Sequence, residues 1–275
     1  MKLNALVRAA TRGTQFMLYL LLGVVLGTTL RLRDGRHWHL TSRGQAITRW
    51  WMQQLTRIVG IRITQYGRPL TANVMLVANH ISFLDIMVIS SIVPARFLSK
   101  HTVRYWPIIG YLTRLAGTVF IERGKPSQLT PTLVALGQAL RSGRPMLIFP
   151  EGTTSLGTQV LKFHSGLFQA AIENKAPVQA VSLHYRRAAR ADRIAAYIDK
   201  DNFLVSLLRL MAQARTEVHL GFSAPLDSSG QTRQQLAASC HACISQTLQS
   251  QLQTADECDD FDARTELVIL GECPP

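Results

Sequence analysis

From Val74 onward the chain alternates short apolar runs with longer amphipathic stretches. The apolar runs predict strands at Val74–Ala78, Ala95–Ser99, Thr118–Ile121, Pro145–Phe149 and Val178–His184. The stretches between and after them predict helices at Phe83–Val93, Tyr105–Ala116, Leu129–Ser142 and Phe168–Asn174. A late apolar run, Thr216–Phe222, is expected to add an edge strand. This order predicts an α/β fold with a mainly parallel mixed sheet flanked by helices.

The first 40 residues follow a different pattern. Residues 13–30 carry no charge, and Arg12 and Arg31 flank them. This length is at the low end for a transmembrane helix and also suits a helix embedded in one leaflet. A secretory signal peptide is the alternative, because basic residues precede the apolar segment. No clean small-x-small cleavage site follows and several arginines come at once, so we expect an uncleaved anchor.

A second amphipathic helix is predicted at Ser42–Gly60. One side of this helix is apolar and the other is basic. The apolar side carries Trp50, Trp51, Leu55 and Ile58. Such a side suits either the headgroup region of a membrane or the surface of a domain core, and the sequence leaves both open. Together the two segments predict N-terminal membrane-associated helices.

Charge narrows the class of partner. The net charge is +13, and the hydrophobic share of 47% is ordinary for a globular protein rather than for a polytopic membrane protein. Residues 1–69 hold 11 Lys and Arg against one acid. Such an excess suits nucleic acid or an anionic membrane. No aromatic-basic stacking module, zinc-finger spacing or helix-turn-helix is found, so we expect anionic membrane lipids and no nucleic acid as partners.

The cysteines do not predict a metal site. All four, Cys240, Cys243, Cys258 and Cys273, lie in the last 36 residues. The Cys240-x-x-Cys243 pair falls within a predicted helix, and the other two do not form a second matched pair. We therefore expect no zinc here.

The segment Ala78–Asp85 carries the most informative chemistry. His80 and Asp85 stand five positions apart, directly after the predicted strand. Ser82 is the expected N-cap of the following helix, which makes the segment a strand-to-helix turn. In such a turn the carboxylate can hold one ring nitrogen of the histidine, and the other nitrogen is then a general base. No serine or cysteine lies in an obvious nucleophile elbow, so this base is expected to activate a substrate hydroxyl.

Taken alone, a His-x4-Asp spacing is also common in purely structural turns. Here it resembles the first block of the glycerolipid acyltransferases, the lysophosphatidic acid acyltransferase family. Three further segments follow in the family's order: Phe120–Gly124, Phe149–Ser155 and Ala176–Val181. The third block, Phe149-Pro150-Glu151-Gly152-Thr153-Thr154-Ser155, matches closely, whereas the fourth is the least specific. The resemblance covers about residues 70–223 and implies that loops at strand ends gather the four blocks at one rim of the sheet.

The resemblance also implies roles for single residues. His80 would take the proton of a lysophospholipid hydroxyl as that hydroxyl attacks an acyl thioester, and Asp85 would fix the tautomer and stabilise the imidazolium. Arg123 would grip the phosphate of the acceptor. The third block, Glu151, Gly152 and Thr153, would bind the glycerol phosphate. Its carboxylate would act through a hydroxyl or through Arg123, and its backbone amides would contact the phosphate.

Other positions near the blocks keep two interpretations. Lys100, Arg104 and Lys162 either meet phosphates of the donor or are solvated surface charges. Pro177 either shapes a turn at an acyl or donor tunnel or is an ordinary turn proline.

The activity implied by the resemblance is O-acyl transfer. The enzyme would move a fatty acyl group from an acyl-CoA or acyl carrier protein thioester to 1-acyl-glycerol 3-phosphate, giving phosphatidic acid. Another lysolipid acceptor, such as lyso-ornithine lipid, stays open. No cofactor and no metal are expected, because a thioester is already activated. The alternative of a different class is a non-catalytic lipid-binding membrane protein, which the intact set His80, Asp85, Arg123, Glu151 and Gly152 disfavours.

These interpretations divide the chain into four parts. They are a membrane anchor segment at 1–40, an amphipathic interfacial helix and connection at 41–69, an acyltransferase catalytic domain at 70–225, and a C-terminal helix with an acidic tail at 226–275. The expected location is the bacterial inner membrane, with the active site on the cytosolic side.

Overall fold

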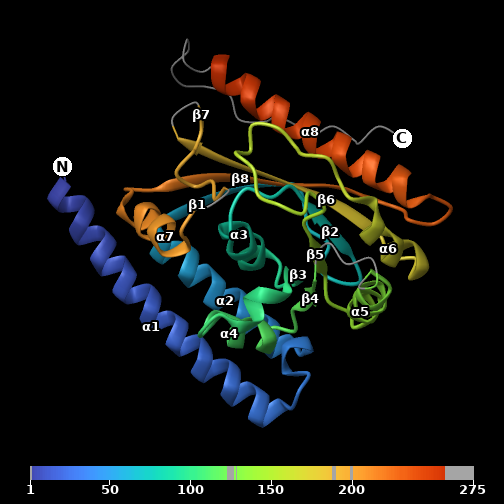
Figure 1. Ribbon diagram of the computed structural model, residues 1–275, viewed down its shortest axis with the longest axis horizontal. Coiled ribbons are helices and arrows are strands. Elements are labelled where there is room, and N and C mark those ends of the chain that lie inside the picture. Colours follow the sequence, from blue (N-terminus) through green and yellow to red (C-terminus); the bar gives the residue numbers. More distant parts are fainter. Residues whose placement is uncertain (1, 123–126, 128, 188–189, 199–200, 258–275) are drawn as a thin grey trace.

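A single mixed sheet organises the protein. The computed structural model describes residues 2–122, 127, 129–187, 190–198 and 201–257 (Figure 1). Within these residues eight strands form the sheet, in the order β1-β8-β6-β2-β5-β3-β4, with β7 paired to β6. The strands are β1 (Ile61–Tyr66), β2 (Met75–Ala78), β3 (Arg96–Lys100), β4 (Val119–Ile121), β5 (Met146–Ile148), β6 (Val178–Arg187), β7 (Arg190–Ala191) and β8 (Thr216–Leu226).

The predicted fold class is confirmed, and one strand position is wrong. Neighbouring long strands pair in parallel, except that β6 and β8 are antiparallel. The late strand β8 was expected at an edge, yet it lies between β6 and β1. The strand at this edge of the sheet is β1, which lies in a segment that was predicted to be a connection. The alternation of apolar and charged residues in Ile61-Arg62-Ile63 suits a strand with one exposed face. With only six residues directly after a long helix, β1 has a weak strand pattern in the sequence.

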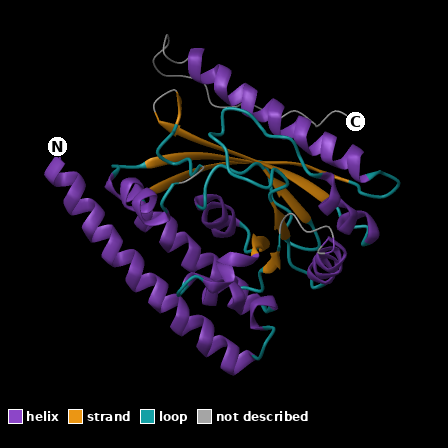
Figure 2. Cartoon of the chain, in the orientation of Figure 1, coloured by secondary structure: helices purple, strands orange, loops and turns teal. Residues whose placement is uncertain are grey.

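Helices cover both faces of the sheet (Figure 2). The first face packs against α1 (Lys2–Asp34), α2 (Ser42–Val59), α3 (Leu84–Ile92), α4 (Ile109–Leu115) and α7 (Phe203–Ala212). The second face packs against α5 (Leu129–Arg141), α6 (Gln169–Glu173) and α8 (Arg233–Glu257). The helix α7 was not predicted from the sequence. Its apolar residues Leu207, Leu210 and Met211 are buried in the first cluster.

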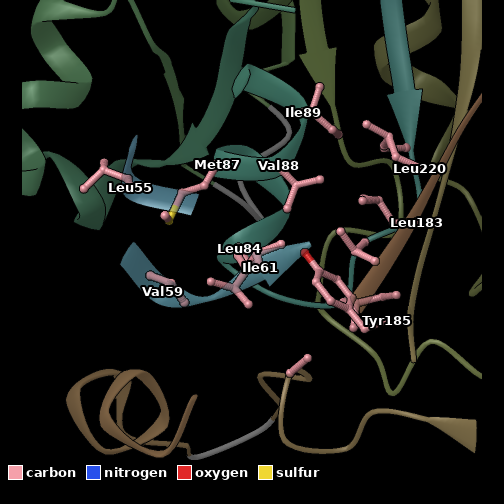
Figure 3. Close-up of a cluster of buried hydrophobic side chains, with 14 of the residues drawn as sticks. Leu55, Val59, Ile61, Leu84, Met87, Val88, Ile89, Leu183, Tyr185 and Leu220 are labelled. Carbon is pink, nitrogen blue, oxygen red and sulfur yellow. The ribbon is translucent and has the colours of Figure 1, made fainter. Parts of the chain in front are cut away.

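The alternation of side chains along β2 decides where the site faces. Leu76 and Ala78 belong to the core cluster on the first face, whereas Met75 and Val77 belong to the cluster on the second. Figure 3 shows part of the first cluster, where side chains of α2 and α3 meet those of β6 and β8. Side chains alternate between the two faces, so His80, two positions after Ala78, is also on the first face, on the side of α1, α2 and α3.

The N-terminal apolar segment forms one continuous helix. With 33 residues, α1 is longer than the charge-free segment that predicted it. Among the described helices it alone is long and apolar enough to cross a membrane. It also packs on the domain, because Arg12 donates to the carbonyl groups of Val59, Met211, Gln213 and Ala214 at the ends of α2 and α7.

The second helix packs on the domain core, which is one of the two alternatives left open. Trp51, Leu55 and Val59 of α2 are buried in the first cluster, and Trp51 Nε1 donates to the carbonyl of Tyr19 at 2.7 Å. Trp50, on the other side, is 42% exposed. The domain boundaries stay a prediction, and residues 41–69 contribute both α2 and strand β1 to the structure.

Candidate active site

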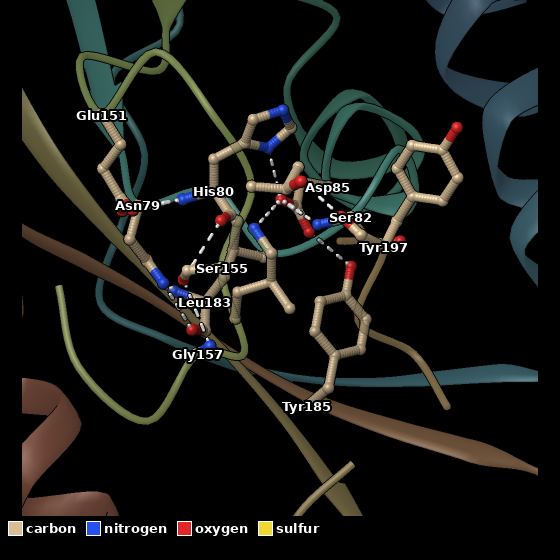
Figure 4. Close-up of polar contacts among 12 residues, drawn as sticks. Asn79, His80, Ser82, Asp85, Glu151, Ser155, Gly157, Leu183, Tyr185 and Tyr197 are labelled. Carbon is tan, nitrogen blue, oxygen red and sulfur yellow. Dashed lines mark hydrogen bonds and ion pairs between the residues drawn. The ribbon is translucent and has the colours of Figure 1, made fainter. Parts of the chain in front are cut away.

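The turn between β2 and α3 brings His80 and Asp85 together. His80 Nδ1 lies 2.8 Å from Asp85 Oδ2 (Figure 4). A carboxylate only accepts, so Nδ1 carries the hydrogen and Nε2 is left as the basic nitrogen. The histidine side chain is 15% exposed and the aspartate is fully buried. The buried carboxylate therefore holds the imidazole ring in place, and Nε2 of His80 is directed away from it.

Asp85, rather than Ser82, makes the side-chain hydrogen bonds that hold the turn before α3. The predicted side-chain cap at Ser82 is wrong: the helix begins after Phe83, and no side chain caps it. Instead Asp85 Oδ2 accepts the backbone N–H groups of Ile81 at 2.7 Å and Ser82 at 3.0 Å. A carboxylate in the first helical turn also complements the helix dipole.

Tyr185 completes the surroundings of the carboxylate and was missed in the sequence. Its hydroxyl, at the far end of β6, donates to Asp85 Oδ1 at 2.8 Å. Burial and the neighbouring Asp85 charge raise the pKa of Tyr185 well above its usual value, so the phenol stays a donor. With four hydrogen bonds a buried carboxylate is satisfied. A tyrosine near the end of a buried strand was the available signal.

The ring of His80 is held by stacking as well. It lies against Phe149, with ring centroids 4.0 Å apart and 19° between the planes. Phe149 follows β5, which pairs directly with β2. The first and third blocks therefore meet at the carboxyl ends of adjacent parallel strands, as predicted from the sequence.

Glu151 makes a hydrogen bond that was not predicted from the sequence. Its Oε1 accepts the backbone N–H of His80 at 3.0 Å, and the residue is 4% exposed. Burial raises the pKa of Glu151 to about 7, with a smaller contribution from Asp85, while the amides of His80 and Leu161 oppose the shift. The expected role in acceptor binding stays a prediction, and the carboxylate also fixes the backbone that carries the base.

The rest of the third block is tied to the same turn. The N–H of Ser155 donates to the carbonyl of His80 at 2.9 Å, and Thr154 Oγ1 donates to the carbonyl of Tyr197. Gly152 has φ of 71°, a conformation that favours glycine. Thr153 is exposed and lines the cavity described below. The geometry leaves Thr153 accessible to a ligand at His80.

The second block is only partly described, and the fourth block lies differently from expectation. Strand β4 holds Phe120 and Ile121, but Arg123 and Gly124 lie outside the described residues, so the phosphate role of Arg123 stays a prediction. The fourth block is not at the rim. Pro177 precedes the start of β6, and its carbonyl accepts the N–H of Met75 at the opposite ends of these strands from His80. Pro177 does not line the cavity at His80, and its two interpretations stay predictions.

A cavity of about 520 Å³ opens at His80. This volume lies within the usual range for small-molecule sites. Its wall is mostly apolar and includes Phe16, Leu20, Gly23 and Gly27 of α1, Trp51 and Leu55 of α2, and Leu112, Leu115 and Ala116 of α4 and its end. Lys100 also lines it, whereas Arg104 and Lys162 are exposed and absent from the wall. The described residues contain no cluster of three metal-ligating side chains.

Replacing Glu151 separates its hydrogen bond from its charge. Glu151→Ala removes the acceptor of the His80 N–H, and we expect kcat/KM to fall about tenfold. Glu151→Gln keeps an amide oxygen there and is expected to retain most activity. The contribution of Glu151 to stability should decrease as pH rises from about 4.5 through about 7, because the folded protein holds this proton more tightly than the unfolded chain. Burial lowers the pKa values of His39 and His184 to about 4 and gives the opposite pH dependence, so the contribution of Glu151 is measured as the difference between the wild type and Glu151→Gln.

The variants are compared by steady-state kinetics and by Tm at pH 5 and pH 8. Relative to Glu151→Gln, the wild type should lose on the order of 3 kcal/mol of stability across this interval. Equal activity of the alanine and glutamine variants would contradict the positioning contact.

A histidine held by a buried carboxylate beside a mostly apolar cavity suits an enzyme that acts on a substrate with an acyl chain. The Acyltransferase family model matches residues 40–184, and this chain belongs to that family. It is a glycerolipid or lysolipid acyltransferase. These findings and the apolar helix α1 indicate membrane association.

Particular relatives refine the comparison. A lyso-ornithine lipid O-acyltransferase of Pseudomonas aeruginosa is 35% identical over 242 residues, covering 87% of this chain and 93% of its own. A 1-acyl-sn-glycerol-3-phosphate acyltransferase of Neisseria gonorrhoeae is 39% identical over 124 residues, covering 44% of this chain and 49% of its own. The crystal structure of a 1-acyl-sn-glycerophosphate acyltransferase from Thermotoga maritima has the same fold. Its TM-score is 0.65 at 18% identity, with coverage of 96% of this chain and 98% of that one.

Proposed function

We propose that this enzyme transfers a fatty acyl group from a thioester to the free hydroxyl of lyso-ornithine lipid. The observation that carries the proposal is the extent of the similarity. Relatives with that name from Pseudomonas aeruginosa and Rhodobacter capsulatus match 87% and 86% of this chain, well beyond the family segment 40–184. The similarity therefore includes part of the chain outside the family segment.

The proposed mechanism is a direct displacement. His80 Nε2 removes the proton from the acceptor hydroxyl, whose oxygen forms a bond to the thioester carbonyl carbon. Asp85 stabilises the imidazolium that results. The tetrahedral intermediate then expels the thiolate, which takes the proton from His80. The products are an ester and a free thiol carrier, and no acyl group is attached to the protein.

The acyl chain of the donor is proposed to lie in the cavity. The apolar wall reaches from His80 to Leu30, Trp38 and Leu115, so the carbonyl can stay at the base while the chain is buried. Either acyl-CoA or acyl carrier protein is compatible with this arrangement. Lys100 at the cavity is available for a donor phosphate. No further cofactor is required by the proposed chemistry.

Filling the cavity should shift the preferred chain length. Ala116→Leu adds bulk to the wall next to Leu115, and we expect kcat/KM to fall by about fourfold for each methylene that no longer fits. Short acyl thioesters should be unaffected. A series of thioesters of increasing length measures the effect, with Ala238→Leu on the exposed side of α8 as the matched control. An equal loss for all chain lengths would contradict the assignment.

Lysophosphatidic acid is the second candidate acceptor, supported by the Arg123 block and by the Neisseria relatives. An ornithine headgroup carries a carboxylate and an ammonium group, whereas lysophosphatidic acid carries a phosphate. Purified enzyme offered both lysolipids with one labelled thioester separates the two. We expect label in ornithine lipid. Label only in phosphatidic acid, lost in Arg123→Ala through a raised KM, would overturn the acceptor and retain the mechanism.

A non-catalytic lipid-binding role is the remaining alternative, and transfer to neither lysolipid would favour it. The intact hydrogen bonding of His80 and Asp85 supports catalysis instead. We place the enzyme in the bacterial inner membrane, with anionic lipids around α1 and the site on the cytosolic side. The basic flanks of α1 and the bacterial relatives support this location.

A further inference from the structure

Tyr197 brings a phenol to the cavity beside His80. The residue lies in the loop between β7 and α7, and it lines the same cavity as the base. In Figure 4 the imidazole of His80 and the phenol of Tyr197 both point toward the top of the view, away from Tyr185. Within the described part of the chain the phenol hydroxyl has no hydrogen-bond partner, although the backbone of the same residue has two. The hydroxyl is therefore available to a ligand.

The backbone of Tyr197 is bonded to both blocks that form the site. Its N–H donates to the carbonyl of Ile81, the residue after His80, at 3.0 Å. Its own carbonyl accepts the hydroxyl of Thr154 in the third block. The next residue of that block, Ser155, donates its N–H to the carbonyl of His80 at 2.9 Å. Tyr197 is therefore joined to the turn of the base from two sides, which fixes its position relative to His80.

The loop that carries Tyr197 is held at its beginning as well. Asp192, which is 2% exposed, accepts the N–H of Ile194 at 2.9 Å through its carboxylate and the N–H of Ala195 at 3.1 Å through its carbonyl. The N–H of Asp192 donates to the carbonyl of Tyr185, whose hydroxyl holds the carboxylate of the catalytic pair. A donor fixed in this way before the substrate arrives can stabilise developing charge without reorganisation.

The other donors near the base have other partners or other predicted roles. In the third block, Thr154 donates to the carbonyl of Tyr197, and Thr153 is predicted to contact the acceptor. Lys100 lines the cavity at the end of β3 and is proposed to meet a phosphate of the donor. Among the described residues that line the cavity and are joined to the turn of His80, this leaves the hydroxyl of Tyr197 as a neutral donor without a role.

The reaction develops charge close to this hydroxyl. Attack on the thioester places a negative charge on its carbonyl oxygen, and a fixed donor stabilises such a charge more strongly in an apolar surrounding than in water. Phe83 lies 5.5 Å from Tyr197 and Phe149 lies 4.0 Å from His80, measured between ring centroids. The attacking oxygen, the carbonyl group and its donor together extend about 7 Å from a base. A phenol whose backbone is bonded to the residue after His80 suits this separation.

We propose that the hydroxyl of Tyr197 donates a hydrogen bond to the carbonyl oxygen of the thioester and stabilises the charge that develops on it. As the lysolipid oxygen bonds to the carbonyl carbon, an electron pair of the C=O bond moves to that oxygen, and the phenol keeps its proton. The pair returns to the carbonyl when the thiolate leaves. This inference rests on the proposed function for its substrates. It adds Tyr197 as a catalytic residue and Thr154 as the residue that positions it.

The test removes the hydroxyl and keeps the ring. For Tyr197→Phe we expect kcat to fall about 10²-fold, with the KM values of both substrates close to those of the wild type. The Tm should not change, because the ring still packs against Phe83 and both backbone hydrogen bonds are kept. Tyr105→Phe is the matched control and should keep the wild-type kcat, since Tyr105 is 70% exposed and does not line the cavity.

Two further measurements separate this role from a structural one. Thr154→Val removes the anchor of the Tyr197 carbonyl and should lower kcat about tenfold, whereas Thr154→Ser, which keeps a hydroxyl, should retain more activity. An inhibitor with the chain and carrier of the donor, but with a methylene group in place of the thioester carbonyl, should bind the wild type and Tyr197→Phe equally.

Wild-type kcat in Tyr197→Phe would overturn the proposal. So would an inhibitor that loses as much affinity in this variant as kcat/KM decreases, because the hydroxyl would then act on the chain or the carrier. Transfer by the wild type to neither lysolipid would overturn the proposed function as well, so the two failures are distinguishable.

Discussion

Replacing His80 by alanine is expected to lower kcat for acyl transfer by about 10²–10⁴-fold. His80 is the group that can take the acceptor proton, because Nδ1 is bonded to Asp85 and the side chain lines the cavity. Without it, a neutral hydroxyl must attack the thioester. The measurement is the initial rate of labelled ester formation at saturating concentrations of both substrates, with wild type and variant at equal concentration.

Two controls make this result specific. His241→Ala, on α8 at the opposite face of the sheet, should retain wild-type activity. The Tm of His80→Ala should decrease only slightly. The variant loses the stacking on Phe149 and one of the four hydrogen bonds to Asp85, while the other three stay in place. Transfer at the wild-type rate by a folded His80→Ala variant would exclude this base.

The second large effect is expected for Asp85→Asn. An amide cannot accept all four hydrogen bonds that the carboxylate accepts, so its NH₂ group faces an N–H or hydroxyl donor. It also cannot stabilise an imidazolium by charge. We expect kcat to fall by about 10³-fold or more, in line with removal of the carboxylate from other histidine–aspartate pairs. An unpaired buried donor costs about 1–3 kcal/mol as well, so Tm should also decrease.

Tyr185→Phe separates catalysis from stability at this carboxylate. It removes one of the four hydrogen bonds and leaves the charge and the His80 contact in place. We expect about a tenfold loss of kcat at most, with a smaller decrease in Tm than Asp85→Asn. If Tyr185→Phe were as inactive as Asp85→Asn at equal Tm, the charge of Asp85 would not be the decisive property.

Features fixed by neighbouring residues were predictable from the sequence. The apolar runs gave β2, β5 and β6 to within a few residues, because buried parallel strands are continuous apolar segments. The closeness of His80 and Asp85 followed from a short turn between a strand and a helix. Both depend on local pattern, and the resemblance to a known family added the third block.

Features fixed by distant residues were not predictable. The order of the sheet places β8 beside β1, through a pairing of segments about 150 residues apart that neither segment reveals alone. Tyr185 meets Asp85 across 100 positions for the same reason. The role of Glu151 in acceptor binding stays a prediction, but its hydrogen bond to the backbone N–H of His80 depends on the folded chain and could not be predicted from the sequence.

The cavity illustrates the same limit on a larger scale. Its wall combines residues of α1, α2 and α4 with the turn that carries His80. Each helix shows an apolar side in the sequence, which is equally compatible with membrane contact and with core packing. In α1 the two sides differ: Phe16 and Leu20 are buried against the domain, whereas Leu18 and Leu21 are exposed.

The central claim is that His80 and Asp85 transfer the acyl group directly from thioester to lysolipid. It is tested by incubating purified enzyme with a labelled acyl thioester, first alone and then with lysolipid, while label on protein, label on lipid and free thiol are followed. The account predicts no label on protein at any time, and one free thiol for each ester formed after the lysolipid is added. Label that binds covalently to the protein first and then moves to the lipid would contradict it.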